Sequence, residues 1–141
     1  MPAIDPRKAT VLVVEDNHHN LFLFELLLIE DVGVRYYQGL ASGAELFATI
    51  RNHPLMRIDL ILLDLRLRGD DGLTICRKLR DDPRFAATTI VATTADVTPA
   101  TAEAVREAGF DGFIAKPINR HRFPDQIRQL CAGRTVWDAG H

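Results

Sequence analysis

The chain has 141 residues, of which 47% are apolar and 26% charged, and its net charge is -2. A chain of this length fits one domain that buries about two-thirds of its unfolded surface, so folding requires neither a metal nor a disulfide. The slightly acidic balance excludes general electrostatic attraction to nucleic acid. The most hydrophobic stretch, residues 21–29, is well short of the roughly 20 residues that span a bilayer, so we expect no membrane association.

Two further features indicate a cytoplasmic protein. Residues 1–10 include Asp5 and Arg7 where a signal peptide would have its apolar core. The two cysteines, Cys76 and Cys131, show neither a C-x-x-C motif nor a metal-ligand spacing. Such cysteines are typical of reduced thiols packed in a core.

Five segments have the composition of β-strands. Residues 10–14 (TVLVV) form a β-branched run, and residues 58–63 form a nearly continuous apolar run typical of a strand buried on both faces of a parallel sheet. Residues 34–38 are more polar, which suits an edge strand. The other two expected strands are residues 88–94 and 110–115.

Five predicted helices alternate with these strands, at residues 18–31, 41–52, 73–80, 98–108 and 120–131. Asn17 can cap the first helix, and Gly33 can end it. The alternation predicts an α/β fold with right-handed crossovers, a five-stranded parallel sheet and helices on both faces. We expect an N-terminal extension at 1–8, one domain at 9–132 and a disordered polar tail at 133–141.

Polar side chains follow four of the predicted strands. They are Glu15, Asp16, Asp64, Thr93, Thr94 and Lys116. Because the carboxyl ends of parallel strands share one edge of the sheet, these groups should gather there. Two carboxylates about 4 Å apart repel by roughly 4 kcal/mol at an effective dielectric near 20, so three of them require a cation or a raised pKa. A hard divalent cation fits, with Mg²⁺ expected and Mn²⁺ as a substitute.

An acidic metal site of this kind suits phosphoryl transfer. A carboxylate can itself be the nucleophile and form an acyl phosphate, and Asp64, on the central strand, is placed for that role. Glu15 and Asp16 would hold the metal. Lys116 would pair with phosphoryl oxygens, and a threonine hydroxyl would donate to another. Taken alone, Asp64 is more typical of a solvated loop acid, and the roles above depend on the other polar residues at this edge.

The same residues resemble the receiver domain of two-component response regulators, over roughly residues 9–132. In that family an acidic pair follows the first strand, and the phosphorylated Asp ends the third and is followed by an Asp-Gly turn. Thr-Ala or Ser-Ala ends the fourth strand, and Lys-Pro follows the fifth. The matching residues here are Glu15-Asp16, Asp64, Asp71-Gly72, Thr94-Ala95 and Lys116-Pro117.

The resemblance implies a flavodoxin-like, doubly wound (βα)5 fold with strand order 2-1-3-4-5. The chemotaxis regulator of this family is the standard example of that order. The resemblance also implies a cis Lys116-Pro117 bond and a metal site in which the backbone carbonyl of Arg66 joins Glu15, Asp16 and Asp64.

By resemblance, the chain is a stand-alone response regulator of the chemotaxis type. Such a protein accepts a phosphoryl group on Asp64, with Mg²⁺, from a phosphohistidine of a sensor histidine kinase or a histidine phosphotransfer protein. It then binds an unidentified output protein, or forms a homodimer, through helix 98–108, strand 110–115 and helix 120–131. We expect a phosphoacceptor with intrinsic self-phosphorylation and self-dephosphorylation, not an enzyme.

Four further residues receive roles from the resemblance. Thr94 and Phe113 would form the conformational switch, although Phe113 also suits a plain core position. Arg66 and Asp96 would tune how quickly the phosphoryl group is hydrolysed, either as an ion pair or as separate solvated charges. Arg68 stands where receivers usually have proline, which suggests a more mobile or differently shaped loop.

Three alternatives remain open from the sequence. The chain could be the receiver fragment of a larger hybrid kinase. It could also be a phosphatase with an aspartate nucleophile, but such enzymes have a general acid two residues further on, where Arg66 stands here. A flavin carrier on the same fold would need hydroxyls and backbone N–H groups for the FMN phosphate, where this chain has the acidic residues 15–17.

Overall fold

A parallel sheet of six strands forms the centre of the computed structural model, which describes residues 3–140. The strands, in chain order, are β1 (Thr10–Val14), β2 (Tyr36–Leu40), β3 (Leu60–Asp64), β6 (Thr89–Thr94), β7 (Gly112–Ala115) and β8 (Trp137–Asp138). Their order across the sheet is β2-β1-β3-β6-β7-β8. A short antiparallel pair, β4 (Arg66–Leu67) and β5 (Asp70–Asp71), follows β3.

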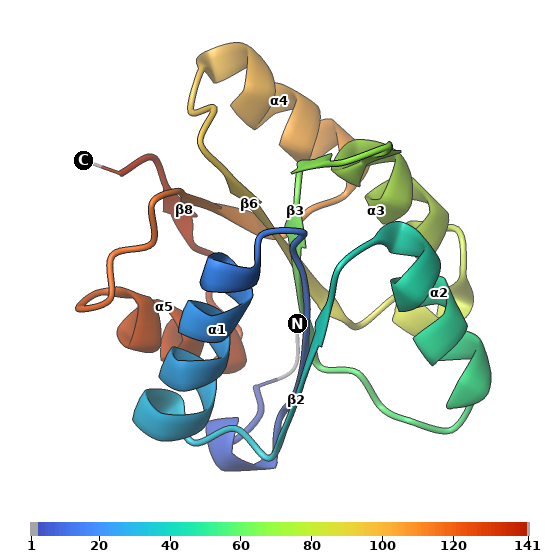
Figure 1. Ribbon diagram of the computed structural model, residues 1–141, viewed down its shortest axis with the longest axis vertical. Helices are drawn as coiled ribbons and strands as arrows, with labels where there is room; N and C mark the ends of the chain where they lie inside the picture. Colours follow the sequence, from blue (N-terminus) through green and yellow to red (C-terminus); the bar gives the residue numbers. More distant parts are fainter. Residues whose placement is uncertain (1–2, 141) are drawn as a thin grey trace.

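Helices cover both faces of the sheet (Figure 1). They are α1 (His18–Leu26), α2 (Gly43–Asn52), α3 (Gly72–Arg80), α4 (Pro99–Ala108) and α5 (Phe123–Cys131). α1 and α5 pack on one face, and α2, α3 and α4 pack on the other. Within residues 3–140 no helix has the length and apolar character needed to cross a membrane.

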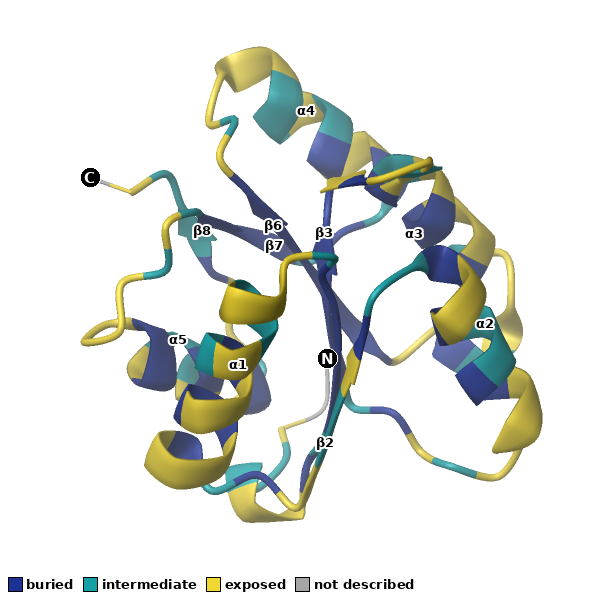
Figure 2. Cartoon of the chain, in the orientation of Figure 1, coloured by how far each residue is buried: buried dark blue, intermediate teal, exposed yellow. Residues whose placement is uncertain are grey.

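Alternating side chains of the strands fill two separate cores. Val11 and Val13 of β1 pack with Phe24 of α1, while Leu12 and Val14 pack toward α2 and α3. β1 and β3 are therefore apolar on both faces, as a sheet covered by two helical layers requires. Figure 2 shows these central strands as buried along their length.

The predicted fold is confirmed: the five expected strands occur in the order 2-1-3-4-5, here labelled β2-β1-β3-β6-β7. Some boundaries differ from the sequence-based expectation. β2 begins at Tyr36 instead of residue 34, because the N–H groups of Gly33 and Val34 donate to the Leu28 carbonyl at 2.9 and 3.1 Å. Gly33 has φ 81°, the left-handed conformation that ends many helices.

Residues 134–140 correct the expectation of a disordered tail. Trp137–Asp138 form the sixth strand, β8, which pairs in parallel with β7. The Phe113 N–H donates to the Val136 carbonyl at 2.9 Å, and Val136 is buried. A strand of two residues is too short to show an alternating pattern in the sequence. It forms because the neighbouring strand provides its hydrogen-bond partners. The expectation for residue 141 lies outside the described residues.

Two buried cysteines match the expected core thiols. Cys76 lies in α3 and Cys131 ends α5, and neither forms a disulfide. Burial raises the pKa of each thiol to about 11, so both are neutral at pH 7. The Cys131 carbonyl accepts a hydrogen bond from the Ile4 N–H at 2.7 Å, which attaches the N-terminal residues to α5.

Candidate functional site at the carboxyl edge of the sheet

Three carboxylates meet where β1 and β3 end. Oxygen atoms of Glu15, Asp16 and Asp64 lie within 4.8 Å of one another. Glu15 and Asp64 are buried, whereas Asp16 is partly exposed. The predicted gathering of acids is therefore present, and one side of it remains open to solvent.

Lys116 places its ammonium group between two of these acids. Its Nζ lies 2.8 Å from Glu15 Oε1 and 3.0 Å from Asp64 Oδ2. Burial works against the charged ammonium, but the hydrogen bonds and charges of the two carboxylates outweigh it and raise the Lys116 pKa. The Lys116-Pro117 bond is cis, as the resemblance implied, and the Lys116 N–H donates to the Thr94 carbonyl at 2.8 Å.

Burial and neighbouring groups have opposite effects on the pKa of the Asp64 carboxyl. Burial raises its pKa, and the Arg66 N–H and Lys116 lower it in part. The Arg66 N–H donates to Asp64 Oδ1 at 3.0 Å, so Oδ1 and Oδ2 have different donors. The carboxylate is thus fixed in orientation before any ligand binds.

The turn after Asp64 is shaped by a glycine. A Cβ at Gly72 would lie 2.5 Å from the Asp64 carbonyl oxygen and 2.7 Å from the Leu65 Cα. Only glycine therefore allows α3 to begin directly behind β3. Asp71 caps that helix by accepting from the Leu73 N–H at 3.0 Å.

Two polar contacts at the acids were not predicted. Asn20 Nδ2 donates to Glu15 Oε1 at 3.1 Å. The Arg68 N–H donates to Asp16 Oδ2 at 2.8 Å. The one sequence signal for the contact between Asn20 and Glu15 is the position of Asn20, three residues after the N-cap Asn17.

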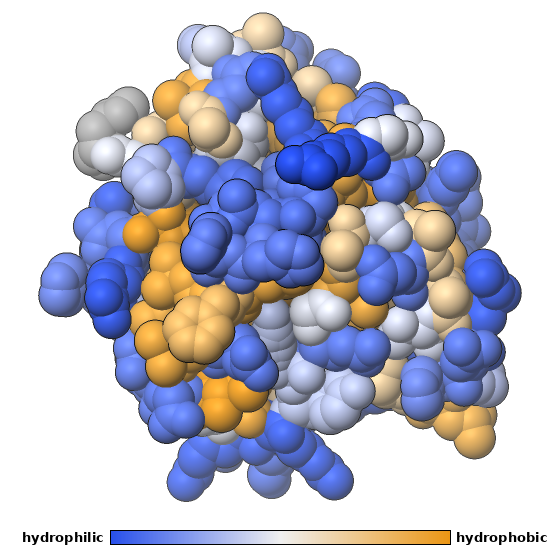
Figure 3. Space-filling view, viewed as in Figure 1, coloured by the Kyte–Doolittle hydropathy of each residue, from blue (hydrophilic) through white to orange (hydrophobic). Residues whose placement is uncertain are grey.

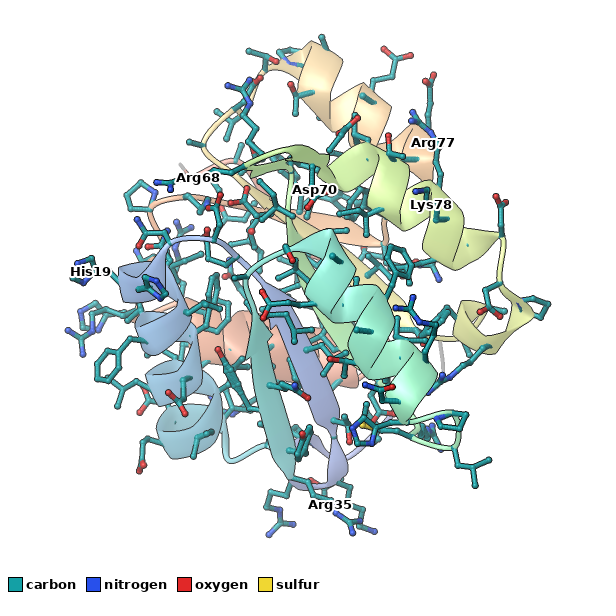
Figure 4. All side chains as sticks on the ribbon, turned by 45° about the vertical axis from the view of Figure 1, so that its right-hand side comes forward. His19, Arg35, Arg68, Asp70, Arg77 and Lys78 are labelled. Carbon is teal, nitrogen blue, oxygen red and sulfur yellow. The ribbon has the colours of Figure 1, made fainter. Side chains whose placement is uncertain are left out.

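The Arg68 contact gives the departure from the family pattern a physical consequence. A proline at this position has no N–H and could not donate to Asp16. The loop also folds back as the β4-β5 pair around Gly69, whose φ is 73°. Asp70 then reaches the start of α2, where it accepts from the Gly43 N–H at 3.1 Å (Figure 4).

Arg66 and Asp96 form an ion pair at the mouth of the site. Arg66 Nη2 lies 3.0 Å from Asp96 Oδ2. Hydrogen bonds from the Thr98 N–H and the Thr101 hydroxyl lower the pKa of Asp96, which keeps it charged. The Asp96 N–H donates to Thr94 Oγ1 at 3.0 Å, so the loop after β6 links the threonine to the ion pair.

Thr94 and Phe113 lie on the same face of the sheet. Phe113 belongs to the core shared with α3 and α4, Thr94 lies two residues after Ala92 of the same core, and both are buried. The Phe113 ring already points inward and packs on Trp137, with ring centroids 6.0 Å apart. Phe113 therefore occupies a core position. This position does not test its predicted switch role.

The donor set fits a magnesium ion. Glu15, Asp16 and Asp64 offer only oxygen atoms, the ligands that hard divalent cations prefer. The partly exposed side at Asp16 leaves space for water and phosphate oxygens, with which Mg²⁺ completes its coordination.

Comparison with known proteins agrees with this geometry. The family model for the response regulator receiver domain matches residues 11–128. The polar-differentiation response regulator DivK of Brucella anthropi is 34% identical over 119 residues, which cover 84% of this chain and 93% of DivK. The hybrid signal transduction histidine kinase L of Dictyostelium discoideum is 35% identical over 133 residues, but these are 8% of that protein.

Solved structures share the fold. The chemotaxis response regulator CheY4 of Vibrio cholerae superposes with a TM-score of 0.78 at 22% identity, covering 87% of this chain and 98% of CheY4. The receiver domain of the sensor histidine kinase PA1611 of Pseudomonas aeruginosa superposes with a TM-score of 0.72 at 29% identity, covering 89% and 98%, and that structure has magnesium in its active-site cleft. The chain belongs to the response regulator receiver domain family.

Proposed function

We propose that this protein is a single-domain response regulator that carries a phosphoryl group on Asp64. The donor is a phosphohistidine of a sensor histidine kinase or a histidine phosphotransfer protein in the cytoplasm. The observation that carries the proposal is the position of Asp64, within reach of Lys116 and of two further acids. The match to 93% of DivK supports a single-domain protein over a fragment of a hybrid kinase.

The chemistry assigned to each residue follows from its contacts. An Asp64 carboxylate oxygen attacks phosphorus, the P–N bond to the donor histidine breaks, and the imidazole leaves with the electron pair and takes a proton. Lys116 stays near Asp64 Oδ2 and would neutralise a phosphoryl oxygen. The Thr94 hydroxyl, buried at the end of β6, would donate to another oxygen.

Mg²⁺ is the proposed cofactor, with Mn²⁺ as a substitute. Glu15, Asp16, Asp64 and the Arg66 carbonyl would hold the ion, which neutralises charge on the carboxylates and on the phosphoryl oxygens when bound. The magnesium in the cleft of the PA1611 receiver domain supports this assignment.

The exposed surface next to the site supports a protein as the phosphoryl donor. Phe22 and Leu26 of α1, and Ile29 of the helical segment Leu27–Val32 that continues it, are exposed at intervals of four and three residues. Figure 3 shows apolar surface where α1 lies. Contiguous exposed apolar surface is typical of protein-binding sites.

Two further roles belong to the proposal. Transfer of the phosphoryl group would draw Thr94 toward it and shift Phe113, and so change the surface formed by α4, β7 and α5, through which an output protein or a second copy binds. The Arg66–Asp96 ion pair, at 3.0 Å, would limit how water approaches the acyl phosphate.

The test is incubation with acetyl phosphate and Mg²⁺, followed by intact-mass measurement. We expect a single phosphoryl adduct on the wild type, no adduct on Asp64→Asn, and none on the wild type in EDTA. Asp71→Asn is the matched control, because asparagine keeps the cap of α3 and the residue lies outside the acidic cluster.

Two results would contradict the proposal. The first is an adduct that persists in Asp64→Asn. The second is repeated turnover of a phosphomonoester that depends on Asp64, which would identify the alternative, an aspartate-nucleophile phosphatase.

A further inference from the structure

Residues 135–140, here called the C-terminal segment, lie along the outer edge of β7. This edge is the centre of the surface formed by α4, β7 and α5, so the segment covers part of that surface (Figure 1). β8 contributes the sixth strand, and Phe113 and Trp137 face each other in register. The surface through which a receiver could bind a partner is therefore occupied by its own chain.

On the α4 side, the contact is made by an aromatic ring. Trp137 packs on Phe113 with centroids 6.0 Å apart, and the Arg106 guanidinium carbon of α4 lies 4.2 Å from the Trp137 ring centroid. A guanidinium this close to an indole ring forms a cation–π interaction. The α4 side thus recognises an aromatic side chain.

On the α5 side, the contact is made by a carboxylate. Asp138 Oδ2 accepts from Gln126 Nε2 at 2.6 Å and lies 3.4 Å from Arg122 Nη2. Because Trp137 and Asp138 are neighbours in a strand, their side chains point to opposite faces of the sheet and reach opposite helices. One dipeptide therefore bridges α4 and α5.

The backbone of β7 is shaped for a strand beside it. The Phe113 N–H points outward and donates to the Val136 carbonyl at 2.9 Å. A Cβ at Gly112 would overlap the same carbonyl oxygen, so glycine at this position allows the close approach. Gly112 does not have a positive φ, so backbone conformation does not require glycine there.

We propose that the surface of α4, β7 and α5 is a strand-accepting docking site, and that the C-terminal segment occupies it as an intramolecular competitor. The partner it fits is an extended protein segment in which an aromatic residue is followed by an acidic one. Arg106 would stack on the aromatic ring, Arg122 and Gln126 would bind the acid, and the Phe113 N–H would bind the backbone.

Tethering explains why such a competitor is effective. A segment joined to α5 by a short linker is present at a local concentration of roughly millimolar, far above that of most free partners. A partner must therefore bind more tightly than the C-terminal segment, or bind when the segment is weakened. This inference concerns the covering of the surface and does not depend on phosphorylation of Asp64.

The test uses full-length protein and a fluorescent peptide with the sequence of residues 134–140. We expect Trp137→Ala, whose own segment is weakened, to bind the peptide about tenfold more tightly than the wild type does. A peptide with alanine in place of its tryptophan should bind about tenfold more weakly than the parent peptide. Tyr36→Ala, which removes an exposed aromatic ring from β2 at the opposite edge, is the matched control and should bind as the wild type does.

Hydrogen exchange of the Phe113 amide, followed by NMR, shows directly whether the segment is docked. We expect faster exchange in Trp137→Ala than in the wild type and in Tyr36→Ala. The inference is overturned if this amide exchanges quickly in Trp137→Ala but the peptide does not bind. It is equally overturned if the amide stays protected without Trp137, or if the wild type and Trp137→Ala bind the peptide equally. Dimerisation of Trp137→Ala in sedimentation would assign the surface to a second copy and overturn the separate partner.

Discussion

The Asp64 carboxyl combines burial, which favours the neutral acid, with contacts that favour the anion. Only 4% of the residue is exposed, and the net effect is a raised pKa. The Lys116 ammonium offsets part of the repulsion from Glu15, which shares it. A bound metal ion would offset the remaining repulsion between the carboxylates, because its positive charge favours the ionised form of Asp64.

A pH dependence of stability follows for Asp64 in metal-free protein. Because the folded-state pKa is raised, the folded protein binds the proton more strongly than the unfolded chain does. The Asp64 contribution to stability is fully present below the unfolded pKa and is lost as the pH rises through the folded pKa. Asp64→Asn should therefore be more stable than the wild type near pH 7, by about 1–2 kcal/mol, since one carboxylate pair repels by roughly 4 kcal/mol before Lys116 offsets it. Urea unfolding in EDTA between pH 4 and 7 measures the difference, which should shrink toward pH 4; a constant difference would contradict this cause.

The Arg66–Asp96 ion pair predicts a modest effect on the lifetime of the phosphoryl group. Arg66 is largely exposed, and an exposed ion pair is worth about 0.2–1 kcal/mol, so Arg66→Ala should speed hydrolysis by about fivefold at most. The decay of phosphorylated protein, followed by intact mass, measures this rate. Arg57→Ala is the matched control, because Arg57 pairs with Asp59 at 3.0 Å before β3, at the other end of that strand. Slower hydrolysis in Arg66→Ala would contradict a shielding role.

At the scale of elements, Arg80 joins α3 to the turn before β7. Its guanidinium donates to the carbonyls of Gly109, Phe85 and Thr88 at 2.8–2.9 Å and to Asp111 Oδ2 at 2.6 Å. These bonds fix the end of α3 against the connection from α4 to β7. The strand that carries Phe113 and leads to Lys116 is therefore positioned from the opposite end of the sheet.

Loss of Arg80 should destabilise the protein more than loss of an exposed neighbour does. Arg80→Ala leaves several part-buried carbonyls and one carboxylate without their donor, which should cost about 2–4 kcal/mol of unfolding free energy. Lys78→Ala removes a charge from an exposed position of the same helix and should change stability by less than about 0.5 kcal/mol (Figure 4). Urea midpoints of the two variants test the contrast, and equal midpoints would show that the Arg80 bonds contribute little.

For the whole molecule, an ion bound at the acidic cluster would add to the stability of the folded state. The three carboxylates come from strands that are brought together only in the folded sheet, so an ion bound there stabilises the folded state alone. The two helical layers and the sheet should therefore become more stable together when Mg²⁺ is added.

Thermal unfolding with increasing Mg²⁺ measures this coupling. At a free concentration of 100 times the dissociation constant, stability should rise by about 2.7 kcal/mol. Asp16→Asn, which lacks one proposed ligand, should show a much smaller rise, whereas Asp71→Asn should respond as the wild type does. A rise of the same size in Asp16→Asn would place the bound ion elsewhere.

The sequence by itself determined the alternation of strands and helices, the strand order by resemblance, and the acids, threonine and lysine at the carboxyl edge. These features are local, because apolar runs and the residues that follow them mark strand ends without knowledge of the partner strands. Only the tertiary structure decided that Arg66 pairs with Asp96, that Asn20 and the Arg68 N–H hold Glu15 and Asp16, and that Trp137 covers Phe113. Except for Asn20, these contacts join residues far apart in the chain. A two-residue strand such as β8 exists only because β7 offers it an edge.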